Sequence, residues 1–342
     1  MGDTDRNLYP SATNPKTPFS YATGVNYNRH ATASSGGTSQ ITKAEAEHDL
    51  PQISKIAKMI RVFAFNENVM DEAKKLKLEV ALGTENSYVT KFANDPSSCR
   101  TYVADNIQPY SDIIKIVSVG NEVFNKTGFA ASTVSAAIKN LKSAMGTDLK
   151  IPVTTDCIWA NVGHGSGPSW APSTGALTPN GEEILTTLQK LYGSDAYLLA
   201  SFYPYWDVKG WENTPGLAKK LLPYALFQDA SLGPVANQFD SDYETLRIAM
   251  KNAKLEDVTV LVSENGWATE DNKFASVPNL NTYINGYHNW QQSEGISLTT
   301  FVFEMYDEPG KPGDEGTFGL YTSESALKDG LTLPDWTTPI GS

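Results

Sequence analysis

The chain has 342 residues, of which 40% are hydrophobic and 19% are charged, and its formal net charge is −12. This composition is typical of a globular protein, and no apolar run approaches the roughly 20 residues that a membrane-spanning helix needs. The acidic excess, without clusters of lysine and arginine, argues against nucleic acid as a partner and favours a neutral or cationic ligand.

Short apolar runs alternate along the chain with stretches of helical periodicity. We interpret eight runs as strands, at residues 23–28, 59–65, 79–86, 113–122, 151–159, 196–205, 258–267 and 298–308. Helical spacing is found between them, at residues 42–57, 66–77, 87–110, 133–145, 181–192, 241–253 and 277–295.

Alternation of strand and helix implies parallel strands joined by right-handed crossovers. Eight such units predict an α/β fold of the closed (β/α)₈ TIM barrel type. A doubly wound open sheet is the alternative, and the barrel is favoured because no glycine-rich phosphate loop opens the first helix.

No internal repeat or shift in composition marks a second domain, so we expect residues 1–342 to form a single barrel domain. Residues 1–20 are expected to be an extended or disordered N-terminal segment. They contain no apolar stretch of the kind found in signal peptides, which leaves a cytoplasmic chain or one whose leader has been removed. The Gly/Pro-rich connections 160–180 and 206–240 follow predicted strands and are expected to wall a cleft.

The cysteines and histidines do not indicate a metal site. Cys99 and Cys157 belong to no CxxC pair and have no histidine at ligand spacing. They would pair in a secreted protein, or each is a small core residue. We therefore expect no metal and no cofactor. Asn125 begins a triplet typical of N-glycosylation.

Polar residues gather at the carboxyl ends of the predicted strands, which share one rim in a parallel barrel. Glu122 and Glu264 are therefore expected to face a common pocket. Two carboxylates across a sugar-sized cleft suit glycosidic cleavage, in which one protonates the leaving oxygen and the other acts as nucleophile or base. The plain alternative is that these glutamates only cap or pair with basic side chains. Asn121 and Asn265, beside the two glutamates, are placed to hold sugar hydroxyls.

Eight segments, in barrel order, resemble glycoside hydrolase family 17, the β-1,3-glucanases of plants, fungi and some bacteria. The resemblance covers nearly the whole chain, although Asn265 stands where the plant pattern has a second serine. The segments are GVNYN (24–28), IRVFAFN (60–66), LGTENS (82–87), VSVGNEV (117–123), SFYPYW (201–206), LPYALF (222–227), LVSENGW (261–267) and FEMYDEPGKPGDEGTFGLY (303–321).

The resemblance implies a retaining glycosidase on a (β/α)₈ barrel, with Glu122 as acid/base and Glu264 as nucleophile. It also implies that Glu308, Lys311 and Glu315 form a charged substrate-binding group near the nucleophile. Lys311, between the two other side chains, would hold Glu264 ionised.

Other side chains are expected to support the two glutamates or to bind sugar. Arg61, on the second strand, is predicted to orient Glu264 or Glu122, because a guanidinium fork can hold a carboxylate. Candidates for ring stacking and for hydrogen bonds to sugar, of which some aromatics are expected in the core, are Tyr27, Asn86, Asn121, Tyr203, Tyr205, Trp267, Tyr306 and Phe318.

The expected substrate is a β-1,3-glucan polysaccharide or oligosaccharide cleaved at internal bonds. A β-1,3-glucanosyltransferase with the same covalent intermediate is one alternative, with Trp170, Trp206 and Trp211 as acceptor-site aromatics, and a non-catalytic glucan-binding protein is another. We expect a monomer with no membrane partner. Secretion, or residence in the cell wall, is inferred from the substrate.

Overall fold

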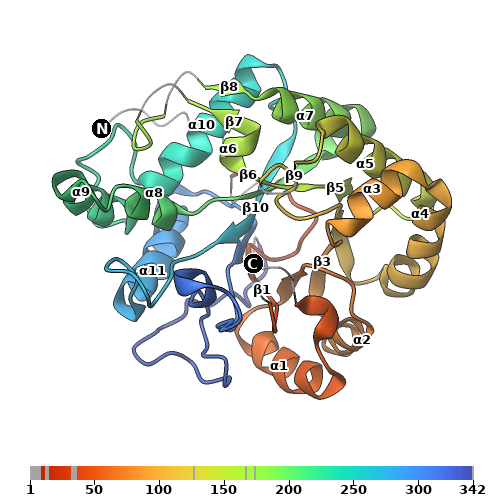
Figure 1. The fold of residues 1–342 in the computed structure, drawn as a ribbon, viewed down its shortest axis with the longest axis horizontal. Coiled ribbons are helices and arrows are strands. Elements are labelled where there is room, and N and C mark those ends of the chain that lie inside the picture. The colour runs from red at the N-terminus through yellow and green to blue at the C-terminus, as the bar shows by residue number, and fades with distance from the viewer. Residues whose placement is uncertain are drawn as a thin grey trace.

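The computed structural model describes residues 9–11, 15–31, 37–125, 128–165, 168–172 and 175–340. A single parallel sheet forms the centre of the molecule, with its segments in the order β5-β4-β3-β2-β1-β11-β10-β9-β6 (Figure 1). The segments are β1 (Thr23–Asn26), β2 (Met59–Val62), β3 (Glu79–Gly83), β4 (Ile114–Ser118), β5 (Val153–Thr154), β6 (Asp156–Ile158), β9 (Tyr197–Ser201), β10 (Thr259–Asn265) and β11 (Thr300–Val302).

The sheet closes on itself through one interrupted strand. Only Thr155 separates β5, which pairs with β4, from β6, which pairs with β9. The Thr155 hydroxyl donates to the carbonyl of Val119 at 2.7 Å, and its carbonyl accepts from the N–H of Leu199 at 3.3 Å. Eight strands therefore form a (β/α)₈ TIM barrel, which confirms the predicted fold and rules out the open sheet.

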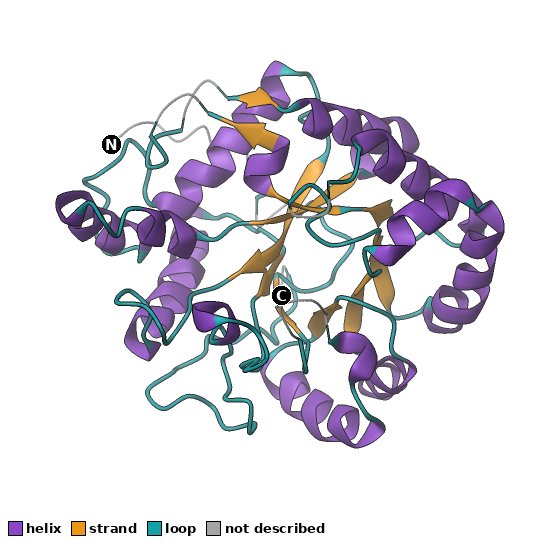
Figure 2. Cartoon of the chain, viewed as in Figure 1, coloured by secondary structure: helices purple, strands orange, loops and turns teal. Residues whose placement is uncertain are grey.

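Helices surround this barrel (Figure 2). They are α1 (Lys43–Ile56), α2 (Glu67–Leu76), α3 (Ser87–Asn94), α4 (Pro96–Tyr102), α5 (Ala131–Met145), α6 (Trp159–Val162), α7 (Pro179–Tyr192), α8 (Pro204–Gly210), α9 (Pro215–Ala225), α10 (Gln238–Asn252) and α11 (Val277–Glu294). The two-residue strands β7 (Gly163–His164) and β8 (Ala176–Leu177) pair antiparallel on a long connection. Local sequence sets the helix starts: Thr42 and Glu45 exchange side-chain and backbone hydrogen bonds in a capping box at α1.

Successive side chains along each strand point to opposite faces of the sheet, so the strands contribute to two separate hydrophobic cores. One residue set faces the helices, and a second set fills the inside of the barrel: Phe19, Met59, Ala81, Ile116, Leu199, Leu261 and Phe301. At Gly24 on β1 a Cβ would lie only 2.5 Å from Cγ of Met59, so the interior has no room for a larger residue there. Phe19 precedes β1 and packs edge-on against Phe301, which closes the amino end of the barrel.

Part of the N-terminal segment is packed against the barrel. Residues 1–8 and 12–14 lie outside the described residues, but the rest of 1–20 packs onto the barrel. The ring of Tyr9 stacks on Tyr243 at 4.8 Å, and the carbonyl of Pro10 accepts from the N–H of Ser297 at 2.9 Å. Burial of Tyr9 and Phe19 makes this packing favourable. These residues form no helix, so the expectation of an extended segment remains open for this part, with the addition that it is packed against the barrel.

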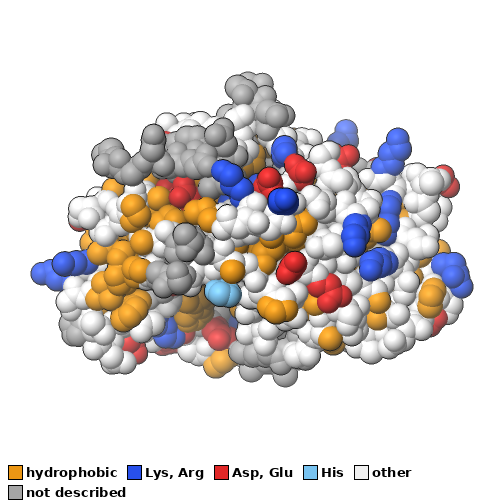
Figure 3. Space-filling view, turned by 90° about the horizontal axis from the view of Figure 1, so that it is seen from above, with side chains coloured by type: hydrophobic (Ala, Val, Ile, Leu, Met, Phe, Trp, Pro, Cys, Tyr) orange, Lys and Arg blue, Asp and Glu red, His pale blue; other side chains and the backbone are white. Residues whose placement is uncertain are grey.

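Cys99 and Cys157 are separate buried thiols, so the disulfide alternative is wrong. Within the described residues, no helix has the length and apolar character to cross a membrane. On the side of the molecule shown in Figure 3, acidic and basic side chains both occur, and hydrophobic side chains are exposed in separate groups.

Candidate active site

A cleft of about 960 Å³ opens at the carboxyl ends of the strands, and both Glu122 and Glu264 line it. The structure thus brings together two carboxylates that are far apart in the sequence. Among the described residues, six aromatic side chains contribute to the same lining: Phe63, Trp159, Tyr203, Trp206, Phe303 and Phe318. The site therefore combines two acids with apolar ring surface.

Glu264 reaches the cleft because β10 is irregular. Val260 and Val262 face the helices and Leu261 faces the interior, so simple alternation would turn Glu264 outward. The register between β10 and β9 shifts between Val262 and Glu264. A bulge of this kind re-aims the following side chains, as is frequent beside active sites.

Both carboxylate oxygens of Glu264 accept hydrogen bonds. Nη1 of Arg61 donates to Oε1 at 2.8 Å, and the hydroxyl of Tyr203 donates to Oε2 at 2.8 Å. The side chain of Glu264 is almost fully buried. Hydrogen bonds to both oxygens fix the orientation of the carboxylate.

Arg61 lies 1% exposed on β2 and divides its guanidinium among several acceptors. Nη1 donates to Asn26 as well as to Glu264, and Nη2 donates to Oδ1 of Asn121 at 2.5 Å. Nη2 also lies 3.3 Å from Oδ2 of Asp156. The contact with Glu264 is the geometry that the predicted supporting role requires, but the fork is shared among partners and is not bidentate to one carboxylate.

Glu122 follows β4 on a tight turn. Its φ is 45°, in the left-handed region, and Gly120 just before it has φ 74°. Oε2 of Glu122 accepts a hydrogen bond from Nδ2 of Asn125 at 2.9 Å. Burial, and then the charge of Glu264, raise the pKa of Glu122 to about 7. A substantial fraction of Glu122 therefore carries a proton near neutral pH, unlike an ordinary glutamate.

Asn86 and Asn121 both line the cleft, and they also brace each other. The N–H of Asn121 donates to Oδ1 of Asn86 at 2.8 Å, and Nδ2 of Asn86 donates to the carbonyl of Asn121 at 3.0 Å. The amide oxygen of Asn121 accepts from Arg61. Much of their hydrogen-bonding capacity is thus used to build the site.

The charged group around Lys311 differs from the predicted one. Nζ of Lys311 forms ion pairs with Glu308 and, at 3.5 Å, with Oε1 of Glu304. Burial disfavours the charge on Lys311, but these carboxylates outweigh it and raise its pKa. Glu315 is exposed at the cleft.

The predicted partners of Lys311 were Glu308 and Glu315, whereas the structure shows Glu304 and Glu308. Glu304 is fully buried, and burial raises its pKa well above the usual range despite the charge of Lys311. The signal that would have indicated Glu304 is a lone acid in the apolar run FVFEMY.

Four aromatics predicted to bind sugar are core residues. Tyr27, Tyr205, Trp267 and Tyr306 are each 0% exposed, and none lines the cleft. The hydroxyl of Tyr27 donates to Asp49 and that of Tyr205 to Asp314, while the indole N–H of Trp267 donates to a carbonyl. A ring without exposed surface cannot stack on a sugar, so this interpretation of the four is wrong.

Tyr203 and Phe318 do line the cleft, with ring centroids 5.6 Å apart. Phe63, Trp159 and Phe303 were not predicted at the site, although each directly follows an observed strand, β2, β6 and β11 respectively. Trp170 and Trp211, predicted at an acceptor site with Trp206, contact each other outside the cleft lining. Trp206 lies in the cleft.

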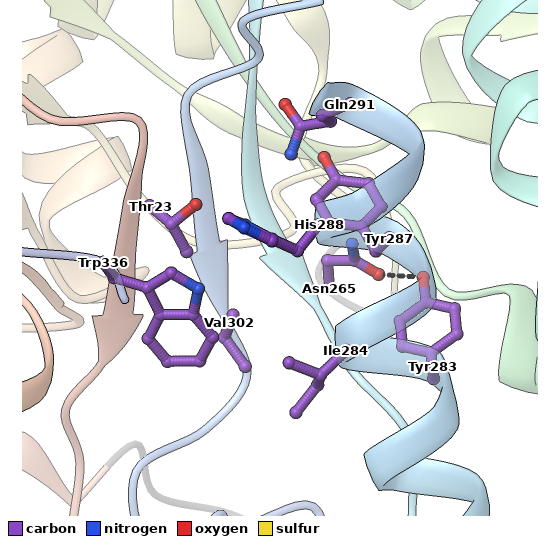
Figure 4. A pocket seen from close by; sticks show the side chains of 9 residues that line it. All are labelled: Thr23, Asn265, Tyr283, Ile284, Tyr287, His288, Gln291, Val302 and Trp336. Atoms are coloured by element: carbon purple, nitrogen blue, oxygen red, sulfur yellow. Dashed lines mark hydrogen bonds between the residues drawn. The ribbon is translucent and has the colours of Figure 1, made fainter. Parts of the chain in front are cut away.

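Asn265 points away from the cleft. It lines a small cavity of about 10 Å³ between the barrel wall and α11, where the hydroxyl of Tyr283 donates to its Oδ1 (Figure 4). The side chains of His288 and Trp336 lie at the same cavity. The prediction that Asn265 holds a sugar hydroxyl is wrong, because the shift in β10 that turns Glu264 inward turns Asn265 outward.

A family model and related sequences both match most of the chain. The model of the Glycosyl hydrolases family 17 matches residues 24–332. The chain is 28% identical over 304 residues to a glucan endo-1,3-beta-glucosidase of Vitis vinifera, which covers 80% of this chain and 86% of the relative.

Two solved structures share the fold. CJP38, a beta-1,3-glucanase and allergen of Cryptomeria japonica pollen, superposes with a TM-score of 0.76 at 24% identity, over 92% of this chain and 99% of that protein. An active-site mutant of the Rhizomucor miehei beta-1,3-glucanosyltransferase in complex with laminaritriose gives a TM-score of 0.59 at 18% identity, over 91% and 96%.

Proposed function

Because the chain belongs to the Glycosyl hydrolases family 17 and is a glycosidase, we propose that it cleaves internal β-1,3-glucosidic bonds of a β-1,3-glucan. The reaction is a double displacement with retention of configuration, in which Glu122 is the acid/base and Glu264 the nucleophile. Residues 1–342 act as a single catalytic domain, and the monomeric protein is secreted or resides in the cell wall, where such polymers occur.

The observation that carries the proposal is the contrast between the two carboxylates in one cleft. Glu264 accepts hydrogen bonds at both oxygens from Arg61 and Tyr203, which fix its carboxylate at the cleft in the way that a nucleophile needs. Glu122 has a pKa raised to about 7 by burial and by the charge of Glu264, which suits a general acid.

The same electrostatics account for the change of role between the two steps. In the first step the Glu264 carboxylate attacks the anomeric carbon while Glu122 gives its proton to the departing glycosidic oxygen. Formation of the glycosyl ester removes the negative charge of Glu264, which is one of the causes of the raised pKa of Glu122. The pKa of Glu122 then falls, so that in the second step it accepts a proton from the attacking water.

Hydrolysis of laminari-oligosaccharides by Glu122→Gln and Glu264→Gln tests the assignment. We expect each variant to lose at least about a hundredfold in kcat, the scale for loss of an acid/base or nucleophile. Glu182→Gln, on the exposed start of α7, is the control and should match the parent. Parental rates in either of the first two variants would contradict the assignment.

Transfer of the glycosyl group to a second sugar is the second candidate outcome. Trp159 and Trp206 favour it, since both line the cleft and offer ring surface on which an acceptor can stack. Products longer than a laminaritetraose substrate at high concentration would identify the glucanosyltransferase. If all products are shorter than the substrate, water is the acceptor. A glucan-binding protein without turnover would yield no products at all.

A further inference from the structure

Asp156 lies where the barrel closes, as the first residue of β6, and its side chain is 0% exposed. Oδ1 accepts a hydrogen bond from the backbone N–H of Glu122 at 3.2 Å. Its own carbonyl accepts from the N–H of Val123 at 3.1 Å. One residue therefore holds two consecutive amides of the turn that carries the proposed acid/base.

This support matters because Glu122 has a positive φ of 45°. A non-glycine residue in the left-handed region is strained and persists only when its surroundings hold it. Hydrogen bonds to the backbone at and after Glu122 supply that restraint, so they also set the direction in which its side chain enters the cleft.

The second oxygen of Asp156 faces the other half of the site. Oδ2 lies 3.3 Å from Nη2 of Arg61, whose Nη1 donates to Glu264 at 2.8 Å. Asp156 does not occur among the described residues that line the cleft. Its carboxylate thus contacts the backbone of one glutamate and the counter-ion of the other from outside the cleft lining.

We propose that Asp156 is a positioning residue that fixes the acid/base and the nucleophile relative to each other, an inference that rests on the proposed function. One carboxylate oxygen restrains the turn of Glu122, and the other restrains the guanidinium that orients Glu264. Misplacement of reacting groups by about 1 Å can cost on the order of a hundredfold in rate.

Asp156 also acts on Glu122 through charge. Among the described residues, the titratable groups that face Asp156 and Glu122 are Arg61 from β2, Cys157 on β6, Tyr203 after β9 and Glu264 on β10. Burial and Glu264 are the main causes of the raised pKa of Glu122, and the negative charge of Asp156 adds to the rise. Loss of that charge lowers the pKa of Glu122, so activity is lost at a lower pH on the alkaline side.

The test begins with Asp156→Asn, which keeps the shape and one acceptor oxygen but presents an amide without charge to Arg61. On laminaritetraose we expect kcat to fall by about tenfold to a hundredfold and KM to stay within about twofold, because no substrate contact is removed. The alkaline limb of the kcat/KM profile should move to lower pH. Parental kcat together with a parental limb would overturn the proposal.

An activated substrate separates the two halves of the inference. The leaving group of 2,4-dinitrophenyl β-laminaribioside departs without a proton, so its rate of release in the first turnover, measured by stopped flow, reports attack by Glu264 without help from Glu122. We expect Asp156→Asn to release dinitrophenol more slowly than the parent. Release at the parental rate would show that Asp156 acts on Glu122 alone and would overturn the proposed link.

Two further variants keep the test decisive. Thr154→Val removes a buried hydroxyl that donates to the carbonyl of Tyr197 at 2.6 Å in the same interrupted strand, and it should match the parent in every readout. Asp156→Glu keeps the charge, so its alkaline limb should remain parental while kcat falls. If Asp156→Asn does not fold, Asp156→Glu carries the test, and a parental kcat in it overturns the proposal.

Failure of this inference can be told from failure of the proposed function. Glu122→Gln and Glu264→Gln are measured in the same assays. If they retain activity, the assignment of the two glutamates fails. If they lose activity while Asp156→Asn and Asp156→Glu behave as the parent, only the role of Asp156 is refuted.

Discussion

The hydrogen bond from Asn125 to Glu122 should set the alkaline limit of activity. Nδ2 of Asn125 donates to Oε2 of Glu122 at 2.9 Å, and this bond lowers the pKa of Glu122 against the larger effect of burial. A hydrogen bond to a charged group contributes about 1.5–3 kcal/mol. Asn125 is exposed, so solvent weakens this hydrogen bond, and we assign it about half of that energy. At 1.36 kcal/mol per unit, this corresponds to a change of about 0.5–1 unit in the pKa of Glu122.

Asn125→Ala is therefore expected to move the alkaline limb of kcat/KM for laminaritetraose upward by about 0.5–1 unit. The sign follows from the charged form: without the donor the Glu122 carboxylate is less stable, so the proton is held to higher pH. Thr127→Ala is the control, since it removes the glycosylation triplet but keeps the Asn125 amide. A limb that stays in place or moves to lower pH in Asn125→Ala would refute the reasoning.

Three further variants probe other parts of the structure. Tyr203→Phe removes a hydrogen bond of about 1.5–3 kcal/mol to the Glu264 carboxylate, so kcat/KM should fall by about tenfold to a hundredfold. A kcat/KM equal to that of the parent would contradict the role of this hydroxyl. Trp206→Ala removes ring surface from the cleft. A loss of about 1 kcal/mol in substrate binding should raise the KM for laminari-oligosaccharides about fivefold and leave kcat unchanged. A fall in kcat alone would contradict a role of Trp206 in substrate binding. Gly24→Ala places a Cβ against Met59 inside the barrel and should lower the free energy of unfolding in urea by about 1–3 kcal/mol, whereas unchanged stability would show that the interior has spare room.

The barrel could be predicted because the sequence pattern that produces it repeats regularly along the chain. Apolar runs alternate with helical periodicity, and parallel strands send their carboxyl ends to one rim, so Glu122 and Glu264 were placed together from pattern alone. Residues 151–159 are predicted as one strand, and in the structure the two segments β5 and β6 within this range together complete the barrel as one interrupted strand.

The direction of individual side chains could not be predicted in this way. A register shift in β10 exchanges the inward and outward positions of Glu264 and Asn265, and no pattern in the sequence marks it. Trp267 and Tyr306 sit in segments that resemble the family's active-site motifs, yet both rings are buried. Membership of a motif places a residue near a cleft, but burial decides whether it can touch a ligand.

The proposed double displacement requires that Glu264 forms a covalent bond to the sugar. Incubation with a 2-deoxy-2-fluoro-β-laminaribiosyl fluoride should slow turnover of the glycosyl enzyme enough to observe it by mass spectrometry of the peptides. We expect one added glycosyl group, located on Glu264, and no such adduct in Glu264→Gln. An adduct on another residue, or inactivation without any adduct, would contradict it.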